Sequence, residues 1–399
     1  MMISRRNFLA VAGAAAAAAA LTACGGSSAS STSTASSAAA STASSAAEGG
    51  EKIVKVALTC DTGTIDDESF NQACWTAVSG YMGDDCQYYI PEADASDEDR
   101  ETMIRQAVND GADVIVCVGY LYGASLAWAA DQYPDVKFIA IDVTQGDIGT
   151  DAIPANCYCI TFKEEQAGYL AGYAIAKDGK TKLGFLGGMA VPAVIRYGYG
   201  FVQGVDAAAA DMGLTDVKVN YIYGGQFFGD ADITAVMDTW YQGGTEVVFA
   251  CGGGIYTSAV DAAKKVGAKV IGVDVDQAGV IAKYAGVDGM TVTSAMKGLY
   301  PATYDTLTDV IVNGNWDKYV GKIETLGLVS GTDPEANYVQ IPMGDGTQWS
   351  DSFTQDDYKA MVKDMFDGKI TVSNNTSSDV SAADFATVIT VDDQGSIKG

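Results

Sequence analysis

Short apolar runs alternate with longer amphipathic stretches from Glu51 onward, and this alternation predicts a parallel α/β sheet. The apolar runs predict strands at Ile53–Cys60, Cys86–Pro91, Asp113–Val118, Val136–Asp142, Cys157–Phe162, Lys182–Leu186, Val217–Tyr223, Glu246–Cys251, Lys269–Asp274 and Met290–Ser294. The clearest helices are expected at Glu165–Ala176, Pro192–Asp211, Asp232–Gln242 and Tyr256–Val266. A further helix at Phe353–Gly368 and a closing strand at Lys369–Val372 are expected near the end of the chain.

An internal repeat predicts two similar lobes. The segments Gly111–Gly119 and Gly244–Gly252 align, and so do the residue pairs Ser125 and Ser258, Asp97 and Asp230, and Asp142 and Asp274. In open α/β sheets, ligands bind beyond the carboxyl ends of the strands, where both Asp142 and Asp274 are expected. If the two lobes face each other, these two aspartates look into one cleft.

The repeat and the order of elements give expected domain boundaries. We expect lobe 1 to contain residues 51–162 and about 291–330. Lobe 2 is expected to contain residues 163–290 and a C-terminal segment of about 331–399.

The N-terminal residues have the layout of an export signal. Ser4–Leu9 resembles a twin-arginine motif, and Ala10–Ala20 is too short and too weakly apolar for a stable transmembrane span. Leu21–Cys24 resembles a lipobox, so we expect residues 1–24 to be a signal peptide with Cys24 as the lipidated residue. Residues 25–50 are almost entirely Ser, Ala, Thr and Gly, which predicts a flexible tether on the outer face of a cell membrane.

Composition and charge exclude several classes of function. The net charge of −27 would repel a phosphate backbone, so nucleic acid is not expected as a partner. The chain has no His, which excludes a Ser-His-Asp triad and His-ligated zinc. Seven Cys follow Cys24, and we interpret most of them as small buried hydrophobes. Cys74 with Cys86 is the disulfide that we consider.

Polar and aromatic residues follow several of the predicted strands. Asp61 and Asn71 are candidates for hydrogen bonds to a ligand, and Phe70 and Phe228 are candidates for stacking on a flat ring. The glycines of the segment 252–254 lack the third glycine of a dinucleotide fingerprint, so no cofactor is predicted. We interpret Gly252 and Gly253 as positions where the backbone approaches a neutral ligand closely.

Several motifs occur in a family-like order along the chain. They are Asp66–Gln72, Tyr133–Phe138, Glu165–Gly172, Gly184–Gly188, Phe228–Asp230, Ile271–Gln277 and Thr293–Lys297. Together they resemble the basic membrane protein family, the nucleoside-binding lipoproteins of ATP-driven importers, over roughly residues 52–372. Glu68 departs from the pattern, because family members usually have Lys at this position.

The resemblance implies a type I periplasmic-binding-protein fold, with two Rossmann-like lobes that close on a purine nucleoside. It implies a monomeric binding protein that works with a permease and an ATPase and that has no enzymatic activity. Phe70 and Phe228 would then stack on the base, Asn71 and Asp142 would bind its edge, and Asp274 and Lys297 would bind the sugar. A sensor for another small ligand and a surface nucleoside hydrolase remain the alternatives.

Overall fold

The computed structural model describes residues 54–83, 86–92 and 95–398. The expected signal peptide, the lipidation site at Cys24 and the tether therefore lie outside the described residues. No helix in the described part of the chain is long and apolar enough to cross a membrane.

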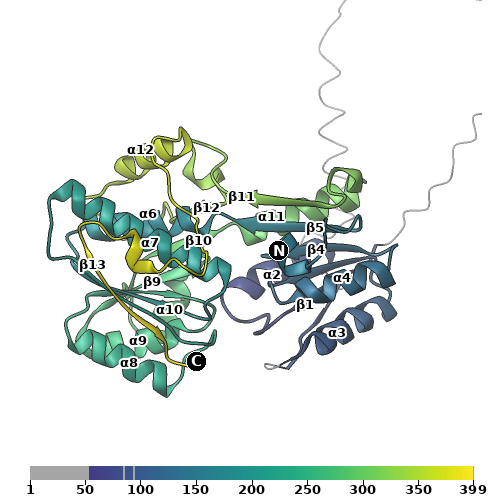
Figure 1. Ribbon diagram of the computed structural model, residues 1–399, viewed down its shortest axis with the longest axis horizontal. Coiled ribbons are helices and arrows are strands. Elements are labelled where there is room, and N and C mark those ends of the chain that lie inside the picture. Colours follow the sequence, from purple (N-terminus) through teal and green to yellow (C-terminus); the bar gives the residue numbers. More distant parts are fainter. Residues whose placement is uncertain (1–53, 84–85, 93–94, 399) are drawn as a thin grey trace, which may run out of the picture. The chain divides into compact units, whose positions relative to one another are not determined.

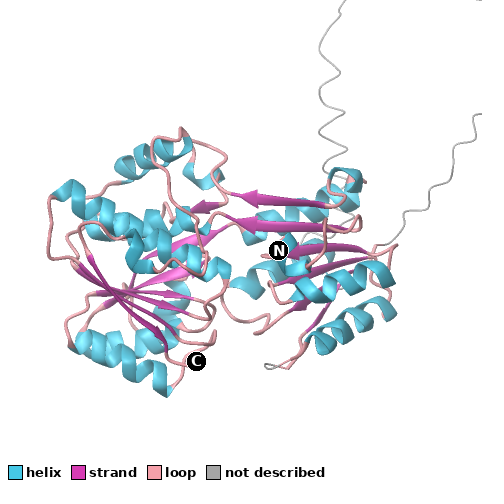
Figure 2. Cartoon of the chain, viewed as in Figure 1, coloured by secondary structure: helices cyan, strands magenta, loops and turns pink. Residues whose placement is uncertain are grey.

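The described residues form two open sheets with the same α/β construction (Figures 1 and 2). The first sheet has the order β11-β5-β4-β3-β1-β2 and is parallel throughout. Its strands are β1 (Val56–Cys60), β2 (Cys86–Tyr89), β3 (Val114–Val118), β4 (Lys137–Ile141), β5 (Cys157–Phe162) and β11 (Lys322–Leu326).

The second sheet has the order β12-β10-β9-β8-β6-β7-β13. Its strands are β6 (Lys182–Gly187), β7 (Lys218–Tyr223), β8 (Val247–Cys251), β9 (Lys269–Asp274), β10 (Thr291–Lys297), β12 (Val339–Gln340) and β13 (Thr390–Ser396). Strand β12 pairs with β10 in the antiparallel direction, and the other pairs are parallel.

Helices cover both faces of each sheet, so the central strands are buried on both sides. The α-helices are α2 (Phe70–Met82), α3 (Asp97–Asn109), α4 (Tyr122–Gln132), α5 (Gln145–Ile148), α6 (Glu164–Lys177), α7 (Pro192–Met212), α8 (Ala231–Gln242), α9 (Tyr256–Val266), α10 (Ala278–Ala285), α11 (Leu299–Leu307) and α12 (Gln355–Phe366). Helices α6 and α7 lie on one face of the second sheet and α8 and α9 on the other (Figure 1). Apolar side chains under α3 and α4 and under α8 and α9 form a core in each lobe.

The ten strands expected from the apolar runs are all present, with ends that shift by up to three residues. Three other features differ from expectation. Strand β10 belongs to the second sheet, although we expected residues from about 291 in lobe 1, and the chain returns only with α11, which packs on α2. The expected strand at Lys369–Val372 is wrong: these residues form no strand, and β13 takes the sheet edge beside β7 instead. Strands β11 and β12 were not anticipated, because β11 is mostly exposed and β12 has only two residues, so neither carries a clear apolar pattern.

Equivalent contacts in the two lobes confirm the internal repeat. The Ser125 hydroxyl donates to the carbonyl of Asp97 at 3.3 Å, and the Ser258 hydroxyl donates to the carbonyl of Asp230 at 3.0 Å. Each hydroxyl ties the helix after one strand to the start of the preceding helix. The alignment of these residues in the sequence therefore reflects one structural unit that occurs twice.

The chain crosses between the sheets three times among the described residues, after β5, after β10 and after β11. Direct contacts also join the lobes. The Gln277 amide donates to the carbonyl of Glu68 at 3.1 Å, and the Ser69 hydroxyl donates to Asp274 at 2.8 Å. The Cys74 thiol is free and fully buried, so the disulfide considered with Cys86 is not formed in this structure.

Candidate functional site

A pocket lies where the carboxyl ends of the strands of both sheets meet. It encloses about 860 Å³ of space between atoms, including the part that is open to solvent. Its lining comes from the loops after β1, β3, β4, β6, β7 and β8 and from the beginnings of α2 and α7. The carboxyl ends of β8, β9 and β10 complete it. This is the position at which open α/β sheets bind their ligands.

Eight of the nine predicted ligand-binding residues line this pocket. They are Asp61, Phe70, Asn71, Asp142, Gly252, Gly253, Asp274 and Lys297. The first four come from the first lobe and the last four from the second. The structure therefore brings together residues that are up to 236 positions apart in the sequence.

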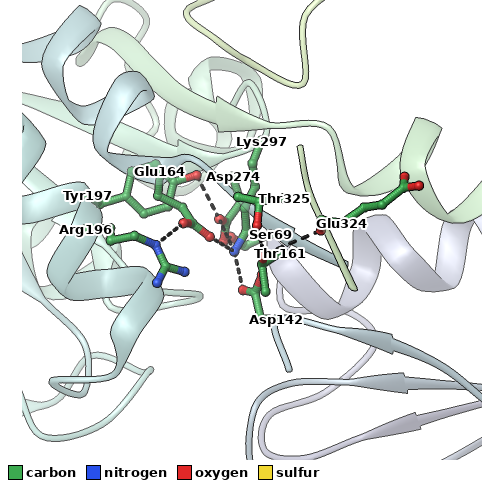
Figure 3. Close-up of polar contacts among 10 residues, drawn as sticks. All are labelled: Ser69, Asp142, Thr161, Glu164, Arg196, Tyr197, Asp274, Lys297, Glu324 and Thr325. Carbon is green, nitrogen blue, oxygen red and sulfur yellow. Dashed lines mark hydrogen bonds and ion pairs between the residues drawn. The ribbon is translucent and has the colours of Figure 1, made fainter. Parts of the chain in front are cut away.

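Lys297, at the end of β10, is the centre of a buried ionic cluster (Figure 3). Its ammonium lies 2.5 Å from a carboxylate oxygen of Asp142, 3.5 Å from Glu164 and 3.8 Å from Asp274. It also lies 4.6 Å from the centre of the Phe70 ring, within the range of a cation–π contact. Lys297 thus joins carboxylates from both lobes beside an aromatic face.

A second cation offsets part of the negative charge of the three carboxylates in the cluster. The Arg196 guanidinium donates to Glu164 at 2.6 Å, and the Glu164 side chain is fully buried. Glu164 begins α6 and Arg196 lies in the second turn of α7. These helices can approach because Gly168 faces α7, where a Cβ atom would lie 2.1 Å from the carbonyl oxygen of Tyr197. Close helix packing therefore fixes the ion pair at the back of the pocket.

The two repeated aspartates share an unusual backbone conformation. Asp142 has φ 60° and Asp274 has φ 65°, in the left-handed region that few residues other than Gly adopt. The Asp274 carboxylate accepts from the Ser69 hydroxyl at 2.8 Å and from the Tyr197 hydroxyl at 3.3 Å. Non-glycine residues in this region cost free energy and are concentrated at functional sites.

Burial and the neighbouring charges have opposite effects on the pKa of each of these groups. Burial raises the pKa of both Asp142 and Asp274 above the ordinary range, and the Lys297 ammonium offsets part of this rise. Burial also disfavours the charge of Lys297, but the surrounding carboxylates raise the pKa of its ammonium above the ordinary value. Burial therefore favours the neutral forms of the two aspartates, while the nearby carboxylates keep Lys297 charged.

The segment after β1 supplies hydrogen-bonding groups from the first lobe. Asp67 accepts from the backbone N–H groups of Ser69, Asn71 and Gln72 and so orders the start of α2. The Asn71 amide donates to Asp67 and to the carbonyl of Thr62, at 3.0 and 3.1 Å. These bonds fix the amide so that its oxygen remains as an acceptor.

Two buried acceptors in the pocket lack a hydrogen-bond partner within the described part of the chain. They are Oδ1 of Asn71 and Oδ1 of Asp142. Leaving such atoms unpaired is costly, and unsatisfied acceptors are rare in native proteins. Asp61, also buried, accepts from the backbone N–H of Leu121 at 3.1 Å, and burial raises the pKa of its carboxyl to about 7. The pocket thus presents acceptors to a ligand that carries N–H or O–H donors.

The aromatic residue of the second lobe requires a correction. Phe227 lines the pocket, whereas Phe228 is 57% exposed and does not line it. Phe228 instead forms a backbone bridge with Gly254. A Cβ atom at Gly252 would lie 2.8 Å from the Phe227 ring. The absence of a side chain at position 252 therefore leaves room for this ring.

Sequence reasoning also missed several residues of the pocket. Arg196 and Tyr197 lie near the start of α7, and the signal available in the sequence was the presence of these polar side chains in a mostly apolar helix. Glu164 directly precedes the expected helix Glu165–Ala176, and no site role was predicted for it. Its role appears when the folded chain places it beside Lys297, which is 133 positions away.

Comparison with known proteins agrees with this architecture. A family model described as ABC transporter substrate-binding protein PnrA-like matches residues 53–332. The nucleoside-binding protein BmpA of an ABC transporter from Lactococcus lactis is 27% identical over 336 residues, which cover 80% of this chain and 89% of that protein. Basic membrane protein B of Borreliella burgdorferi is 29% identical over 313 residues, covering 74% and 85%.

Solved structures confirm the fold class. An ABC transporter solute-binding protein from Aeropyrum pernix superimposes with a TM-score of 0.65 at 22% identity, covering 82% of this chain and 95% of that one. A second, from Conexibacter woesei, gives a TM-score of 0.59 at 22% identity, covering 80% and 99%. The α/β fold of the type I periplasmic binding proteins is therefore confirmed. The chain belongs to the Bmp family of PnrA-like substrate-binding proteins of ABC transporters, and it is a binding protein and not an enzyme.

Proposed function

We propose that this chain captures a purine nucleoside in the pocket between its lobes and delivers it to a permease driven by an ATPase. The observation that carries the proposal is the pair of unpartnered buried acceptors, Asn71 Oδ1 and Asp142 Oδ1, in a pocket lined by Phe70 and Phe227. A purine edge with N–H donors would satisfy these acceptors. The aromatic rings would meet the faces of the same base.

The second lobe supplies groups suited to a sugar. The Asp274 carboxylate has capacity for further donors beyond Ser69 and Tyr197, because an ionised carboxylate offers about four acceptor sites. Vicinal hydroxyls of a ribose would use this capacity, with Lys297 donating to a sugar oxygen. The name of the Lactococcus lactis relative, a nucleoside-binding protein, supports the same class of ligand.

Contacts from both lobes to one ligand would favour the closed arrangement of the lobes. One chain supplies ligand-binding groups from both lobes, so the proposed capture of the nucleoside requires no second copy of the chain.

The ligand class is tested by identifying the retained solute and by one matched pair of variants. Mass spectrometry of small molecules released on denaturation should detect a purine nucleoside. Phe227→Ala should weaken nucleoside binding to the stripped and refolded protein about three- to tenfold, the order of magnitude expected for one aromatic stacking contact. Phe228→Ala, the neighbouring exposed ring, should bind like the parent in titration calorimetry. A released sugar without a base, or equal effects of the two variants, would contradict the proposal.

We also propose that Cys24 carries a lipid that anchors the protein on the extracytoplasmic face of the cell membrane. The proposal rests on Leu21–Cys24 and on the preceding Ala-rich segment. Cys24→Ala should release the protein from the membrane fraction or leave it unprocessed. Fractionation followed by immunoblotting measures both outcomes, and unchanged membrane attachment with normal processing would rule out this anchor.

A further inference from the structure

The segment from Ser373 to Lys398 runs along the second lobe and ends beside the loop that carries Phe227 (Figure 1, yellow). It lies beyond residues 53–332, the part of the chain that the family model matches. The segment is tied to α7 at several points. The Gln203 amide exchanges two hydrogen bonds with the backbone of Ser373, and the Tyr199 hydroxyl donates to the carbonyl of Val380 at 2.9 Å.

Asp206 of α7 fixes the chain just before β13. Its buried carboxylate accepts from the N–H groups of Thr387 and Val388, at 2.7 and 2.8 Å, and from the Thr387 hydroxyl at 2.6 Å. Strand β13 then pairs with β7 in the parallel direction, so that its last residues reach the pocket end of the second sheet. The end of the segment is therefore held at a defined place.

Lys398 contacts the pocket loop directly. Its ammonium donates to Oε1 of Gln226 at 2.7 Å and forms an ion pair with Asp230. The Gln226 amide in turn donates to the carbonyl of Phe228 at 2.9 Å and to Asp230 at 3.0 Å. Asp230 is also the N-cap of α8, through the N–H of Ile233. One lysine thus connects both ends of the segment 226–230.

The loop needs this support because of its sequence. It begins with Gly224 and Gly225, and glycine leaves the backbone with more accessible conformations than any other residue. A Cβ atom at Gly225, which has φ 80°, would lie 2.5 Å from the carbonyl oxygen of Lys398. The absence of a side chain at this position therefore allows Lys398 to approach the loop.

We propose that Lys398 is a positioning residue for Phe227, and that the segment 373–398 holds the aromatic wall of the pocket in its binding position. Lys398 does not line the pocket, and it acts through Gln226 and Asp230. The proposal rests on the proposed function in one respect: Phe227 must contact the ligand. The proposed ordering of the loop 224–230 by Lys398 does not depend on the identity of the ligand.

The test compares Lys398→Ala with one rescue variant and one matched control. Lys398→Arg keeps a cation that can reach Asp230. Lys218→Ala removes another ion pair between β7 and β13, Lys218 with Asp392 at 3.0 Å, but at the end of the strands remote from the pocket. Two quantities are measured on the full protein after removal of retained solute: amide hydrogen exchange of residues 224–230, and affinity for guanosine by calorimetry.

We expect Lys398→Ala to accelerate exchange in residues 224–230 and to weaken guanosine binding about two- to fivefold, the order expected from one partly exposed ion pair. Lys398→Arg should restore most of both quantities, and Lys218→Ala should leave both unchanged. Unchanged exchange or unchanged affinity in Lys398→Ala would overturn the proposal, as would an equal effect of Lys218→Ala. If the parent itself binds no nucleoside, the proposed function fails, and the exchange comparison still decides whether Lys398 orders the loop.

Discussion

At the scale of single residues, the repeat places two aspartates where a binding site needs them. Asp142 directly follows β4 and Asp274 ends the equivalent strand β9, and both adopt the left-handed backbone region. This conformation turns the chain sharply at the strand end. Each carboxylate then reaches the Lys297 ammonium, one from each lobe. The sequence predicted both positions, because a repeat alignment identifies equivalent strand ends without any knowledge of side-chain contacts.

The choice between Phe227 and Phe228 marks the limit of that reasoning. Both rings follow β7, and their side chains leave the backbone in different directions, so only one can face the pocket. The sequence motif contains both and gives no signal that separates them. The packing of the loop against Gly188 and Gly252 determines which of the two rings faces the pocket. A Cβ atom at either glycine would collide with the Phe227 ring. Such contacts between distant segments cannot be read from local sequence.

Asp61 should make the stability of the protein depend on pH. Burial raises the pKa of its carboxyl from an ordinary value of 3.8 to about 7 in the folded protein. The folded state then binds a proton that the unfolded state has already released. The resulting stabilisation is fully present below about pH 4 and is lost as the pH rises through about 7.

We therefore expect Asp61→Asn, which keeps a neutral side chain at every pH, to reduce the loss of stability between pH 5 and pH 8 by about 1–3 kcal/mol. Denaturant unfolding of the ligand-stripped protein at the two pH values measures this difference. Asp66→Asn, an exposed carboxylate in the same loop, is the control and should behave like the parent. An unchanged pH dependence in Asp61→Asn would show that Asp61 is ionised throughout this range.

At the scale of elements, the apolar pattern predicted ten strands. It failed for β11 and β13, whose residues are mostly exposed, and for β12, which has only two residues. These strands form because an existing sheet edge offers unpaired backbone groups, and not because their own sequence favours a strand. The expected strand at Lys369–Val372 illustrates the same point, because the edge beside β7 is taken by residues 390–396 instead.

The pair α6 and α7 shows how helix packing prepares the pocket. Glycines at positions 168, 172, 200 and 204 lie where the helices touch, and a Cβ atom at each would come within 2.1–2.3 Å of the partner's backbone. This close contact brings Glu164 and Arg196 within hydrogen-bond distance. The glycines were visible in the sequence, but the helix that each one faces depends on the tertiary structure.

At the scale of the whole molecule, the two sheets meet at one pocket whose polar groups come from both lobes. Contacts that need no ligand already join the lobes there, from Ser69 to Asp274 and from Lys297 to Asp142. A bound ligand that contacts both sides would add to these contacts and shift the population further towards closure. The two-lobed construction was predictable from the internal repeat. The ionic cluster was not, because Glu164 and Arg196 join it only through tertiary packing.

The central claim is that Asp142 and Asp274 divide the recognition of a nucleoside, with the base assigned to the first and the sugar to the second. Titration calorimetry with guanosine and with guanine tests it most directly. It would use stripped and refolded parent, Asp142→Ala, Asp274→Ala and the control Asp276→Ala. Asp276 is an exposed carboxylate two residues after Asp274. Thermal unfolding of each variant verifies that it is folded.

Removal of one carboxylate leaves ligand donors unpaired in a buried site, at a cost of about 1–3 kcal/mol, or roughly one to two decades in affinity. We predict that Asp142→Ala weakens the binding of guanosine and guanine alike. Asp274→Ala should weaken guanosine and leave guanine largely unchanged, and Asp276→Ala should bind both like the parent. If Asp142→Ala and Asp274→Ala both bind guanosine as tightly as the parent does, the two-aspartate pocket is not the nucleoside site.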